Sequence, residues 1–541
     1  MDLTEYQGMD PLTSPVTWMV LVPALTAVAI LFTPAARKGV VRGVALLGMS
    51  VNLVLATYLL VVATGDLGLA PGVAPVLDTF ARKTTWVAEL GISWNVAADG
   101  MSVAMLFLTS IVIFAGVLVS WSVEDRTKEF YLSLISLVTG VFGVFATRDL
   151  FWFYFFYELA VIPMYLLIGI WGSTRKEYAT MKLTLYLTAG AVLALLGLLM
   201  VYLRTFDHLR GIQPDALPSF DLADVLAAAK AGAFRTSWRG MDFQLWCFPF
   251  LLFGFAAIAP MWPLHTWSPM GHAAAPSAAS MLHAGVLMKL GSYAILRIAI
   301  PALPDGAKWW LPVVGFLAMF NIVYGGLVAV AQRDMKFVVG YSSSSHMGYV
   351  LLGIASMTTL GMSGAVFLMF AHGVMTALAF GLIGFFYDQT HVRTLPDLGG
   401  MAHQIPFVGT CFVIMTMASA GVPGFANFVA EVMVMFSAWE AREAWATLGV
   451  QSVFDPRWFA VIAVFGIVIT GVYLLRAVRE AFFGPRNPRW DGLRDATTPF
   501  QRLPFVFLAA VLLLFGFWPG LLLDVIAGGV APVARALAGN P

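Results

Sequence analysis

Apolar residues fill the chain in long runs separated by short polar connections. A helix that crosses a bilayer needs about 20 predominantly apolar residues, and reading the chain for such runs gives about fourteen. They lie at 16–33, 41–63, 101–121, 129–146, 149–171, 180–203, 243–262, 274–299, 309–330, 337–356, 362–386, 405–437, 457–478 and 503–527. The pattern predicts an all-α polytopic membrane protein with about 14 transmembrane helices, which we number in chain order.

The composition excludes several classes of protein. Of 541 residues, 60% are hydrophobic and 11% are charged, whereas soluble domains carry about 25% charged residues. So few charges cannot cover a soluble enzyme of this size. The net charge of +1 offers no basic surface for nucleic acid. The two cysteines, Cys247 and Cys411, lie in apolar runs, so a disulfide framework or a cysteine-ligated cluster is excluded as well.

Basic residues are concentrated in the odd-numbered connections between the runs. Lys38 and Arg42 follow the first run, Arg126 the third and Arg175 the fifth, and six arginines lie in 476–502. Connections rich in Lys and Arg stay in the cytoplasm, so the bias places both termini on the outer, periplasmic side. The even-numbered connection 204–242 also carries five basic residues, but long loops follow this rule less strictly.

Two of the runs are interrupted by proline and glycine. Pro260 and Pro263 lie in the seventh, and Gly421, Pro423 and Gly424 lie in the twelfth. Such residues free backbone groups that need protein or water partners at membrane depth, and broken helices are common at transport sites. About five runs separate the two breaks, as expected for two five-helix repeats of inverted topology. The alternative is that these prolines only kink ordinary helices.

Ionisable residues inside the runs are the candidate site. An ionisable group at membrane depth is costly and normally marks a pathway. The candidates are Glu158, Lys289 and Glu431, together with Lys182, His265, His283, His346 and His372. Carboxylate, lysine and histidine groups in series suit stepwise proton transfer, because burial and nearby charges bring them towards exchange at physiological pH.

Simpler interpretations remain open for some candidates. His346 follows four serines and can be a histidine at the membrane interface whose hydrogen bonds are satisfied. Lys182 can be one of the basic residues that mark the cytoplasmic side of the membrane. His265 and His272 can satisfy broken backbone at a helix end. For Asp388, His391 and Arg393 we expect a solvated loop face. The chain has no phosphate-binding loop and no zinc-protease motif, so we expect an ion path whose energy source lies in other subunits.

These segments resemble the antiporter-like membrane subunits of respiratory complex I, and among them the chain M group. The matching motifs are Tyr157-Glu158-Leu159 with Pro163-Met164-Tyr165, Pro263-Leu264-His265-Thr266-Trp267 with His272 and Ala275-Pro276, Ala284-Gly285 with Lys289, Asp334-Met335-Lys336 with Tyr341-Ser342-Ser343 and Ser345-His346-Met347-Gly348, and Gly421-Val422-Pro423-Gly424 with Asn427-Phe428 before Glu431. They span roughly residues 95–480.

The resemblance implies fourteen helices with two inverted five-helix repeats, in which helices 7 and 12 are broken. We expect N-terminal helices in 1–125, the first repeat with its outer loop 204–242 in 126–300, the second repeat in 301–450 and C-terminal helices in 451–541. Family members pair a glutamate on helix 5 with a lysine on helix 7, and place further charges on helices 8 and 12. Glu158, Lys289 and Glu431 match three of these four positions, and a glutamate on helix 12 favours the chain M group.

The lysine of helix 7 is missing. It stands two residues before the first proline of the break in the family, and Ile258 occupies that position here. Without an opposite charge, Glu158 is easier to protonate. The first half of the proton path would then need a different set of proton-carrying residues. His283 and His265 are candidate substitutes. His283 lies six residues from Lys289, a spacing that does not share a helix face closely, so it can instead serve another route or simply pack.

The resulting hypothesis is a proton-translocating membrane-arm subunit of NADH:quinone oxidoreductase in the bacterial inner membrane. FMN, iron–sulfur clusters and quinone are expected in partner subunits, and sister antiporter-like subunits and lipid are the expected neighbours. No redox site is expected in this chain. The alternatives are a subunit of a multisubunit cation/proton antiporter or a membrane-bound hydrogenase, or a structural spacer that does not pump.

Overall fold

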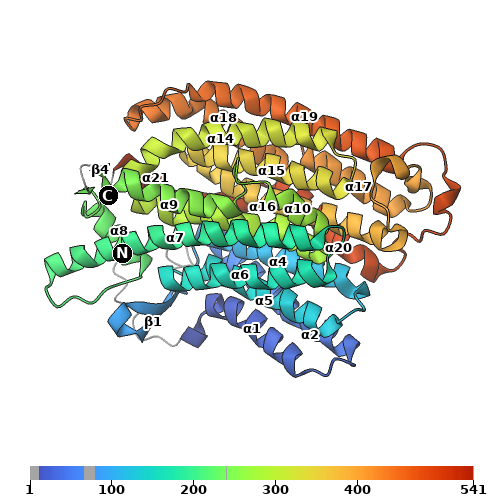
Figure 1. Cartoon of the computed structure of the whole chain (residues 1–541), viewed down its shortest axis with the longest axis horizontal. Coiled ribbons are helices and arrows are strands. Elements are labelled where there is room, and N and C mark those ends of the chain that lie inside the picture. The colour runs from blue at the N-terminus through green and yellow to red at the C-terminus, as the bar shows by residue number, and fades with distance from the viewer. Residues whose placement is uncertain (1–10, 66–79, 239–240, 540–541) are drawn as a thin grey trace.

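Long, nearly parallel helices make up most of the molecule in the computed structural model (Figure 1), which describes residues 11–65, 80–238 and 241–539. The first half contains α1 (Pro15–Phe32), α2 (Lys38–Thr64), α4 (Gly100–Val119), α5 (Thr127–Ala146), α6 (Leu150–Trp171), α7 (Lys176–Ile212), α8 (Leu222–Lys230), α9 (Phe243–Ile258) and α10 (Trp267–Ala274). The next span, Ser277–Ala302, consists of α11 (Ser277–Leu282), the π-helix η5 (His283–Leu287), α12 (Met288–Ala294), the π-helix η6 (Ile295–Ala299) and α13 (Ile300–Ala302).

The second half continues with helices of similar length. They are α14 (Pro304–Ala331), α15 (Met335–Ala355), α16 (Thr359–Thr390), α17 (Pro406–Ser419), α18 (Ala426–Thr447), α19 (Pro456–Phe482), α20 (Pro499–Phe517) and α21 (Gly520–Ala538). Short 3-10 helices lie at Pro11–Thr13, Ala88–Leu90, Ser120–Ser122, Leu395–Asp397, Met401–His403 and Pro488–Trp490. The predicted all-α membrane fold is confirmed.

Twelve of the described helices are long and apolar enough to cross a membrane, so the count of 14 is not reproduced by length and composition alone. The two interrupted runs appear as pairs of shorter helices, α9 with α10 and α17 with α18. The run 503–527 was expected to be one helix, and this is wrong. Pro519 disfavours helical geometry at Trp518, so α20 ends at Phe517 and α21 begins at Gly520.

Matching capping structures at α6 and α15 reveal an internal repeat. Arg-Asp precedes both helices, and Asp149 and Asp334 accept hydrogen bonds from backbone N–H groups of the first turn. Each aspartate also forms an isolated β-bridge, Asp149 with Asp221 and Asp334 with Thr394. Five membrane crossings separate the two starts, so the same structure lies at opposite ends of the bundle, which is the geometry of an inverted repeat.

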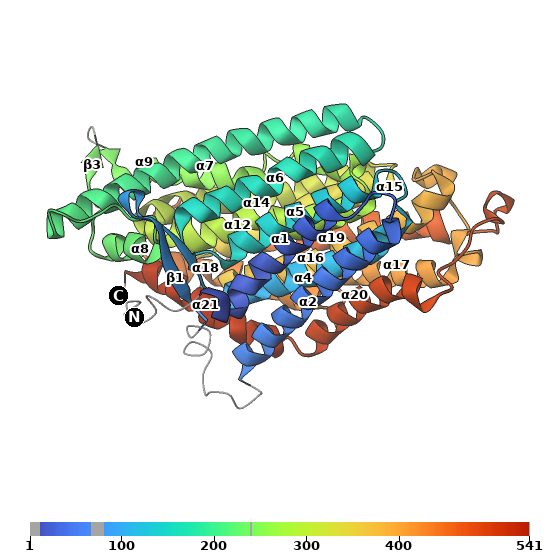
Figure 2. The ribbon, with the colours of Figure 1, turned by 90° about the horizontal axis from the view of Figure 1, so that it is seen from below.

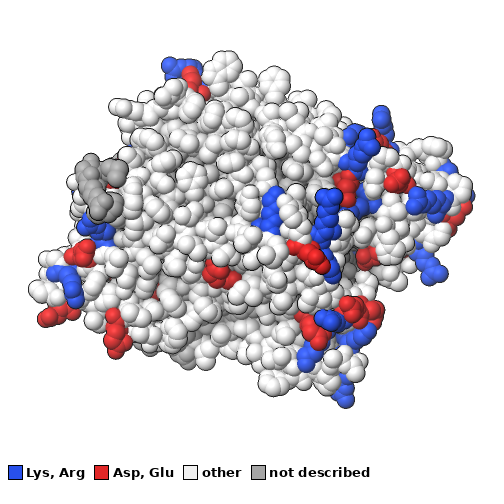
Figure 3. All heavy atoms as spheres, in the orientation of Figure 1, with Lys and Arg blue, Asp and Glu red and all other residues white. Residues whose placement is uncertain are grey.

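The two ends of the bundle differ in structure (Figure 2). One end carries an antiparallel hairpin of β1 (Arg82–Val87) and β2 (Ile92–Val96), with Arg82 opposite Val96, and also α8 and the short pair β3 (Ser237–Trp238) and β4 (Met241–Asp242). We call this the hairpin end. The opposite end carries loops 123–126, 172–175, 391–405 and 483–498, and we call it the basic end. Charged side chains gather at these ends and leave a largely uncharged band between them (Figure 3).

Candidate functional site

The first break separates α9 from α10 at membrane depth, and one amide satisfies its backbone. Asn321 on α14 accepts a hydrogen bond from the Trp262 N–H (2.6 Å) through Oδ1. Its Nδ2 donates to the carbonyl oxygens of Pro260 (2.8 Å) and Ser344 (3.1 Å). Asn321 is fully buried, and leaving these groups unpaired would be costly. Sequence reasoning missed this residue, although an asparagine in an otherwise apolar helix is a visible signal.

Lys289 lies at the centre of the bundle between two π-turns. Its side chain is 0% exposed, and Nζ lies 2.5 Å from the Ala284 carbonyl oxygen and 2.8 Å from Nδ1 of His372 on α16. Single π-turns inside α-helices occur frequently at functional sites, because the extra residue redirects neighbouring side chains. Lys289 and His372 are therefore in direct hydrogen-bond contact.

The contact continues from His372 to Glu431. The His372 and His346 rings stack with centroids 5.1 Å apart, and Nε2 of His346 on α15 lies 3.4 Å from Oε1 of Glu431 on α18. His346 also lies near two carbonyl oxygens, with Nδ1 2.8 Å from that of Ser342 and Nε2 3.1 Å from that of Ser419. Carbonyl oxygens only accept hydrogen bonds, so both contacts are satisfied together when His346 is an imidazolium facing the carboxylate.

The second break supplies one of these contacts. Because α17 ends at Ser419, its carbonyl oxygen has no intrahelical partner and accepts from His346 instead. Gly421 follows in the left-handed region with φ +66°, and a side chain there would collide with the carboxylate of Glu431. A glycine at this turn therefore leaves room for Glu431 beside the break.

His272 and His283 form a second buried pair beside Lys289. Their ring centroids are 4.3 Å apart, and His283 stacks on Trp267 at 5.1 Å. His272 Nε2 lies 3.0 Å from the Ser268 hydroxyl. Among the described residues, Nδ1 of His272 and both ring nitrogens of His283 have no hydrogen-bond partner. The pair thus offers open proton positions next to the central lysine.

Glu158 stands apart from this cluster. It is half-buried on α6, and within the described residues no Lys, Arg or His lies within 4.0 Å of its carboxylate. Ile258, at the end of α9, is 1% exposed and packs against the backbone of α12 near Gly291. Neither His283 nor His265 comes within ion-pair distance of Glu158. The described structure therefore shows no cation in place of the absent lysine.

Lys182 and His265 lie apart from the buried residues between Lys289 and Glu431. Lys182 is half-buried on α7, with Nζ 3.6 Å from the Met270 sulfur and 5.9 Å from the ring centres of Tyr178 and Tyr186. His265 lies in the break and packs edge-on against Tyr324 at 5.5 Å. Neither side chain is joined to the run from Lys289 to Glu431 by a hydrogen bond in the described part of the chain.

Two cavities open at the basic end. The larger, about 530 Å³, is lined by Arg175, Met270, Asp334, His391, Arg393 and Asp397, and we call it the Arg393 cavity. The smaller, about 200 Å³, is lined by Ser122, Ser173, Ser277, Lys336, Tyr387 and Asp388, and we call it the Lys336 cavity. Tyr387 lines both.

The expectation of a solvated loop face is wrong for Arg393. Its side chain is buried, and it donates to the Asp334 carboxylate (2.6 Å), the Ser173 hydroxyl (3.2 Å) and the Ala273 carbonyl oxygen (2.8 Å). Asp388 and His391 are exposed, as expected. A single arginine cannot be distinguished from a loop charge by sequence spacing, because its partners come from three distant segments.

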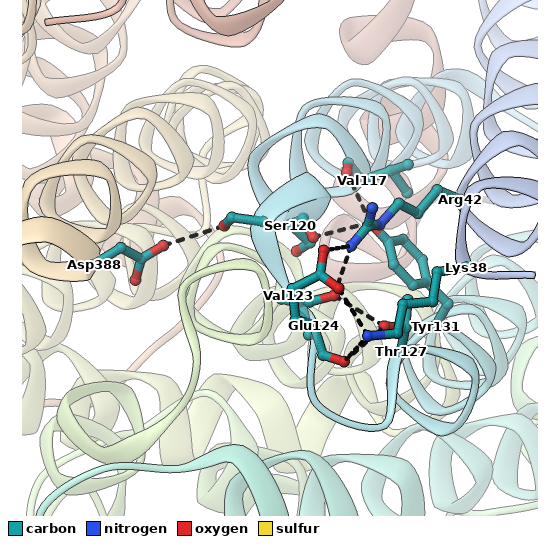
Figure 4. Close-up of polar contacts among 10 residues, drawn as sticks. Lys38, Arg42, Val117, Ser120, Val123, Glu124, Thr127, Tyr131 and Asp388 are labelled. Carbon is teal, nitrogen blue, oxygen red and sulfur yellow. Dashed lines mark hydrogen bonds and ion pairs between the residues drawn. The ribbon is translucent and has the colours of Figure 1, made fainter. Parts of the chain in front are cut away.

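Charged groups also fasten the basic end (Figure 4). Lys38 and Arg42 at the start of α2 bind the Glu124 carboxylate at 2.8 and 2.6 Å. Hydrogen bonds from these two cations lower the pKa of Glu124 to about 2. In the same view, Tyr131 points towards the carbonyl oxygens of Val117 and Ser120, and Asp388 accepts from the Ser122 hydroxyl at 3.3 Å. The α4–α5 connection is thereby held against α2 and α16.

Residues 147–454 match the NADH:quinone oxidoreductase/Mrp antiporter transmembrane family. The chain belongs to this family. It is similar to NAD(P)H-quinone oxidoreductase chain 4 of Synechococcus sp. (strain WH7803), 35% identical over 89% of this chain and 82% of the relative. The corresponding chain 4 of Gloeobacter violaceus is 33% identical over 83% and 80%. The chain is thus an antiporter-like, multi-pass membrane subunit.

Solved structures agree with this assignment. A chain of respiratory complex I from Thermus thermophilus aligns with a TM-score of 0.81 and 27% identity, covering 96% of this chain and 99% of the other. A chain of the Mrp complex from Dietzia sp. DQ12-45-1b aligns with a TM-score of 0.77 and 21% identity, covering 97% and 99%. At that identity the Mrp likeness shows the fold alone.

Proposed function

We propose that this chain translocates protons in the membrane arm of an NADH:quinone oxidoreductase of the bacterial cell membrane. Redox energy would come from partner subunits that hold FMN, iron–sulfur clusters and quinone, and sister antiporter-like subunits would lie beside it. The basic end would face the cytoplasm, with both termini on the other side. The observation that carries the proposal is the buried series Lys289, His372, His346 and Glu431.

The series has the properties of a proton path. Nδ1 of His372 accepts from Lys289, so it can take a proton, and His346 can pass one to Glu431 over 3.4 Å. All four side chains are at most 2% exposed, so their charges interact strongly across the short distances between them. A conformational change driven by a partner subunit would shift protons along the series by moving one charge.

Glu431→Gln in the intact complex tests this role. Glutamine keeps the size of the side chain and cannot carry a proton, so the rate of NADH-driven proton translocation should fall roughly tenfold. The matched control is Glu440→Gln, the same change on an exposed position of α18, which should leave translocation unchanged. Equal rates of proton translocation in both variants would refute pumping through this series and leave the structural-spacer alternative.

The composition of the purified complex tests the assembly. The full-length likeness to chain 4 proteins favours the oxidoreductase, so flavin and iron–sulfur subunits should co-purify with this chain. Nickel–iron subunits would instead indicate a hydrogenase, and the absence of any redox subunit would indicate a cation/proton antiporter.

A further inference from the structure

The Lys336 cavity reaches from the basic end to a buried lysine that the proton series does not use. Its volume of about 200 Å³ has room for about six waters at roughly 30 Å³ each. Asp388 is exposed at its mouth and accepts from Ser122, and serine side chains line its wall. Lys336 lines the same cavity but is only 2% exposed. The cavity is therefore polar, large enough to be hydrated, and ends at an ionisable group.

Lys336 is poorly paired for a buried ammonium. Nζ donates to the Ala275 carbonyl oxygen at 2.8 Å and lies 5.8 Å from the Tyr387 ring centre. No carboxylate among the described residues lies within 4.0 Å of it. The charged groups around it are Asp334, whose carboxylate is bound by Arg393, and Asp388 across the cavity. An ammonium without a close carboxylate exchanges its proton more easily than one held in an ion pair.

Lys336 is linked through Ser280 to the backbone of the segment that carries His272. The Ala275 carbonyl oxygen that accepts from Lys336 also accepts from the Ser280 hydroxyl at 3.2 Å. Ser280 in turn lies 2.9 Å from the His272 carbonyl oxygen. The His272 side chain, with Nδ1 open, lies against His283 beside Lys289. The Lys336 side chain and the backbone of His272 thus lie at the same gap between α10 and α11.

We propose that protons enter this chain through the Lys336 cavity, passing from Asp388 to Lys336 and then by His272 to Lys289, so that uptake does not run through Glu158. The inference rests on the proposed proton translocation and assigns its uptake route. In each step one proton moves: Lys336 gives its proton to His272 and is reprotonated from the cavity, while His272 passes it on to the lysine at the centre.

Substitutions at Lys336 separate a proton carrier from a fixed structural charge. Lys336→Met should lower proton translocation roughly tenfold, and Asp388→Asn should also lower it, because each removes a proton-carrying group. Lys336→Arg should fail like methionine, since a guanidinium stays protonated. Rescue by arginine would show that Lys336 only supplies charge and would overturn the proposal. Asp397→Asn, which removes an exposed carboxylate from the neighbouring Arg393 cavity, is the control and should leave translocation unchanged.

Thiol labelling tests the cavity itself without relying on pumping. Ser277 lines the cavity and has no side-chain hydrogen bond in the described structure, whereas the native Cys247 and Cys411 are buried. The complex that carries Ser277→Cys is placed in sealed vesicles and treated with the membrane-impermeant cation [2-(trimethylammonium)ethyl] methanethiosulfonate. The reagent should modify the new thiol only when it is added on the side of the membrane that the basic end faces. Absence of labelling from that side would overturn the proposed route, even if a Lys336 variant does not assemble.

The two proposals fail differently. If Glu431→Gln abolishes translocation while Lys336→Met and Asp388→Asn leave it intact, the uptake route is wrong and the proposed function stands. If Glu431→Gln has no effect, the function itself is wrong whatever Lys336 does. Loss in all three variants, together with labelling of Ser277→Cys, is the result that we expect.

Discussion

Glu158 and Ile258 occupy the position where the family resemblance implies an ion pair. Glu158 has no cation within 4.0 Å in the described structure, and Ile258 is packed against α12. A carboxylate without its partner cannot be switched by moving that partner's charge. The buried ionisable groups that contact one another lie instead between Lys289 and Glu431, beyond the first break.

Glu158→Gln should therefore change the rate of proton translocation by less than about twofold, well below the roughly tenfold loss expected for Glu431→Gln. The measurement is the rate of NADH-driven proton uptake in vesicles that contain the intact complex, with Glu431→Gln prepared in parallel as the sensitive variant. A loss at Glu158 as large as that at Glu431 would show that the first repeat uses this carboxylate without a lysine.

Single residues also mark how far the sequence could specify the site. Charge at membrane depth pointed to Lys289, Glu431 and the histidines as candidates, because such groups are costly unless they are used; the structure buries Lys289, His372, His346 and Glu431 together, and their role stays a prediction. Sequence could not identify Asn321 or Arg393 as structural anchors, since their partners lie 23 or more positions away. Nor could it show that Glu158 is left without a cation, which depends on where several helices meet.

At the level of helices, α6 and α15 begin with the same aspartate cap at opposite ends of the bundle. Asp149 lies just before α6, outside the spanning segment, and accepts hydrogen bonds from the N–H groups of Ser93, Phe151 and Trp152 at 2.9, 2.9 and 3.2 Å. Burial raises the pKa of Asp149 to about 6, which outweighs the opposing effect of these bonds. The cap is thus protonated more readily in the folded chain than in the unfolded one.

This shift predicts a pH dependence of stability. Between about pH 4, the ordinary value for Asp, and about pH 6, the folded chain holds a proton that the unfolded chain has lost. The stability that Asp149 contributes is therefore present at low pH and is lost as pH rises through 6. Asp149→Asn should remove about 3 kcal/mol or less of this variation.

The measurement is thermal unfolding of the detergent-purified protein across pH 4–7, taken as the difference between wild type and Asp149→Asn. Asp99→Asn is the matched control, because Asp99 shifts the other way: burial would raise its pKa, but Arg297 and Arg148 hold it below the ordinary value. Its contribution falls as pH drops below about 4. An unchanged pH slope in Asp149→Asn would contradict the assignment.

Element boundaries were predictable where apolar runs were bounded by strong signals, and less so where proline lies inside a run. Both breaks fall where proline and glycine indicated them. The helix end at Trp518 could not be read from the apolar run 503–527, because hydropathy carries no information on the backbone geometry that Pro519 imposes on the residue before it. The repeat boundaries at 125, 300 and 450 stay predictions.

For the whole molecule, Arg393 joins the two repeats at the basic end. It belongs to the loop after α16, yet it binds Asp334 at the start of α15, Ser173 after α6 and the Ala273 carbonyl oxygen at the end of α10. The last of these contacts also supplies a cation to the negative end of a helix dipole. This one side chain thereby holds together residues that line the Arg393 cavity, and it fixes the C-terminal end of α10, which carries His272.

Arg393→Met should destabilise the folded chain by about 2 kcal/mol, because it leaves the partly buried Asp334 carboxylate and two acceptors without their donor. Arg393→Lys should recover only part of this, since an ammonium cannot span three acceptors with the fixed fork of a guanidinium. Thermal unfolding of the purified protein measures the loss, and Arg333→Met, an exposed arginine beside Asp334, is the control. If Arg393→Met and Arg333→Met unfold at the same temperature, the contacts of Arg393 add no stability. The two repeats would then be held together by helix packing alone.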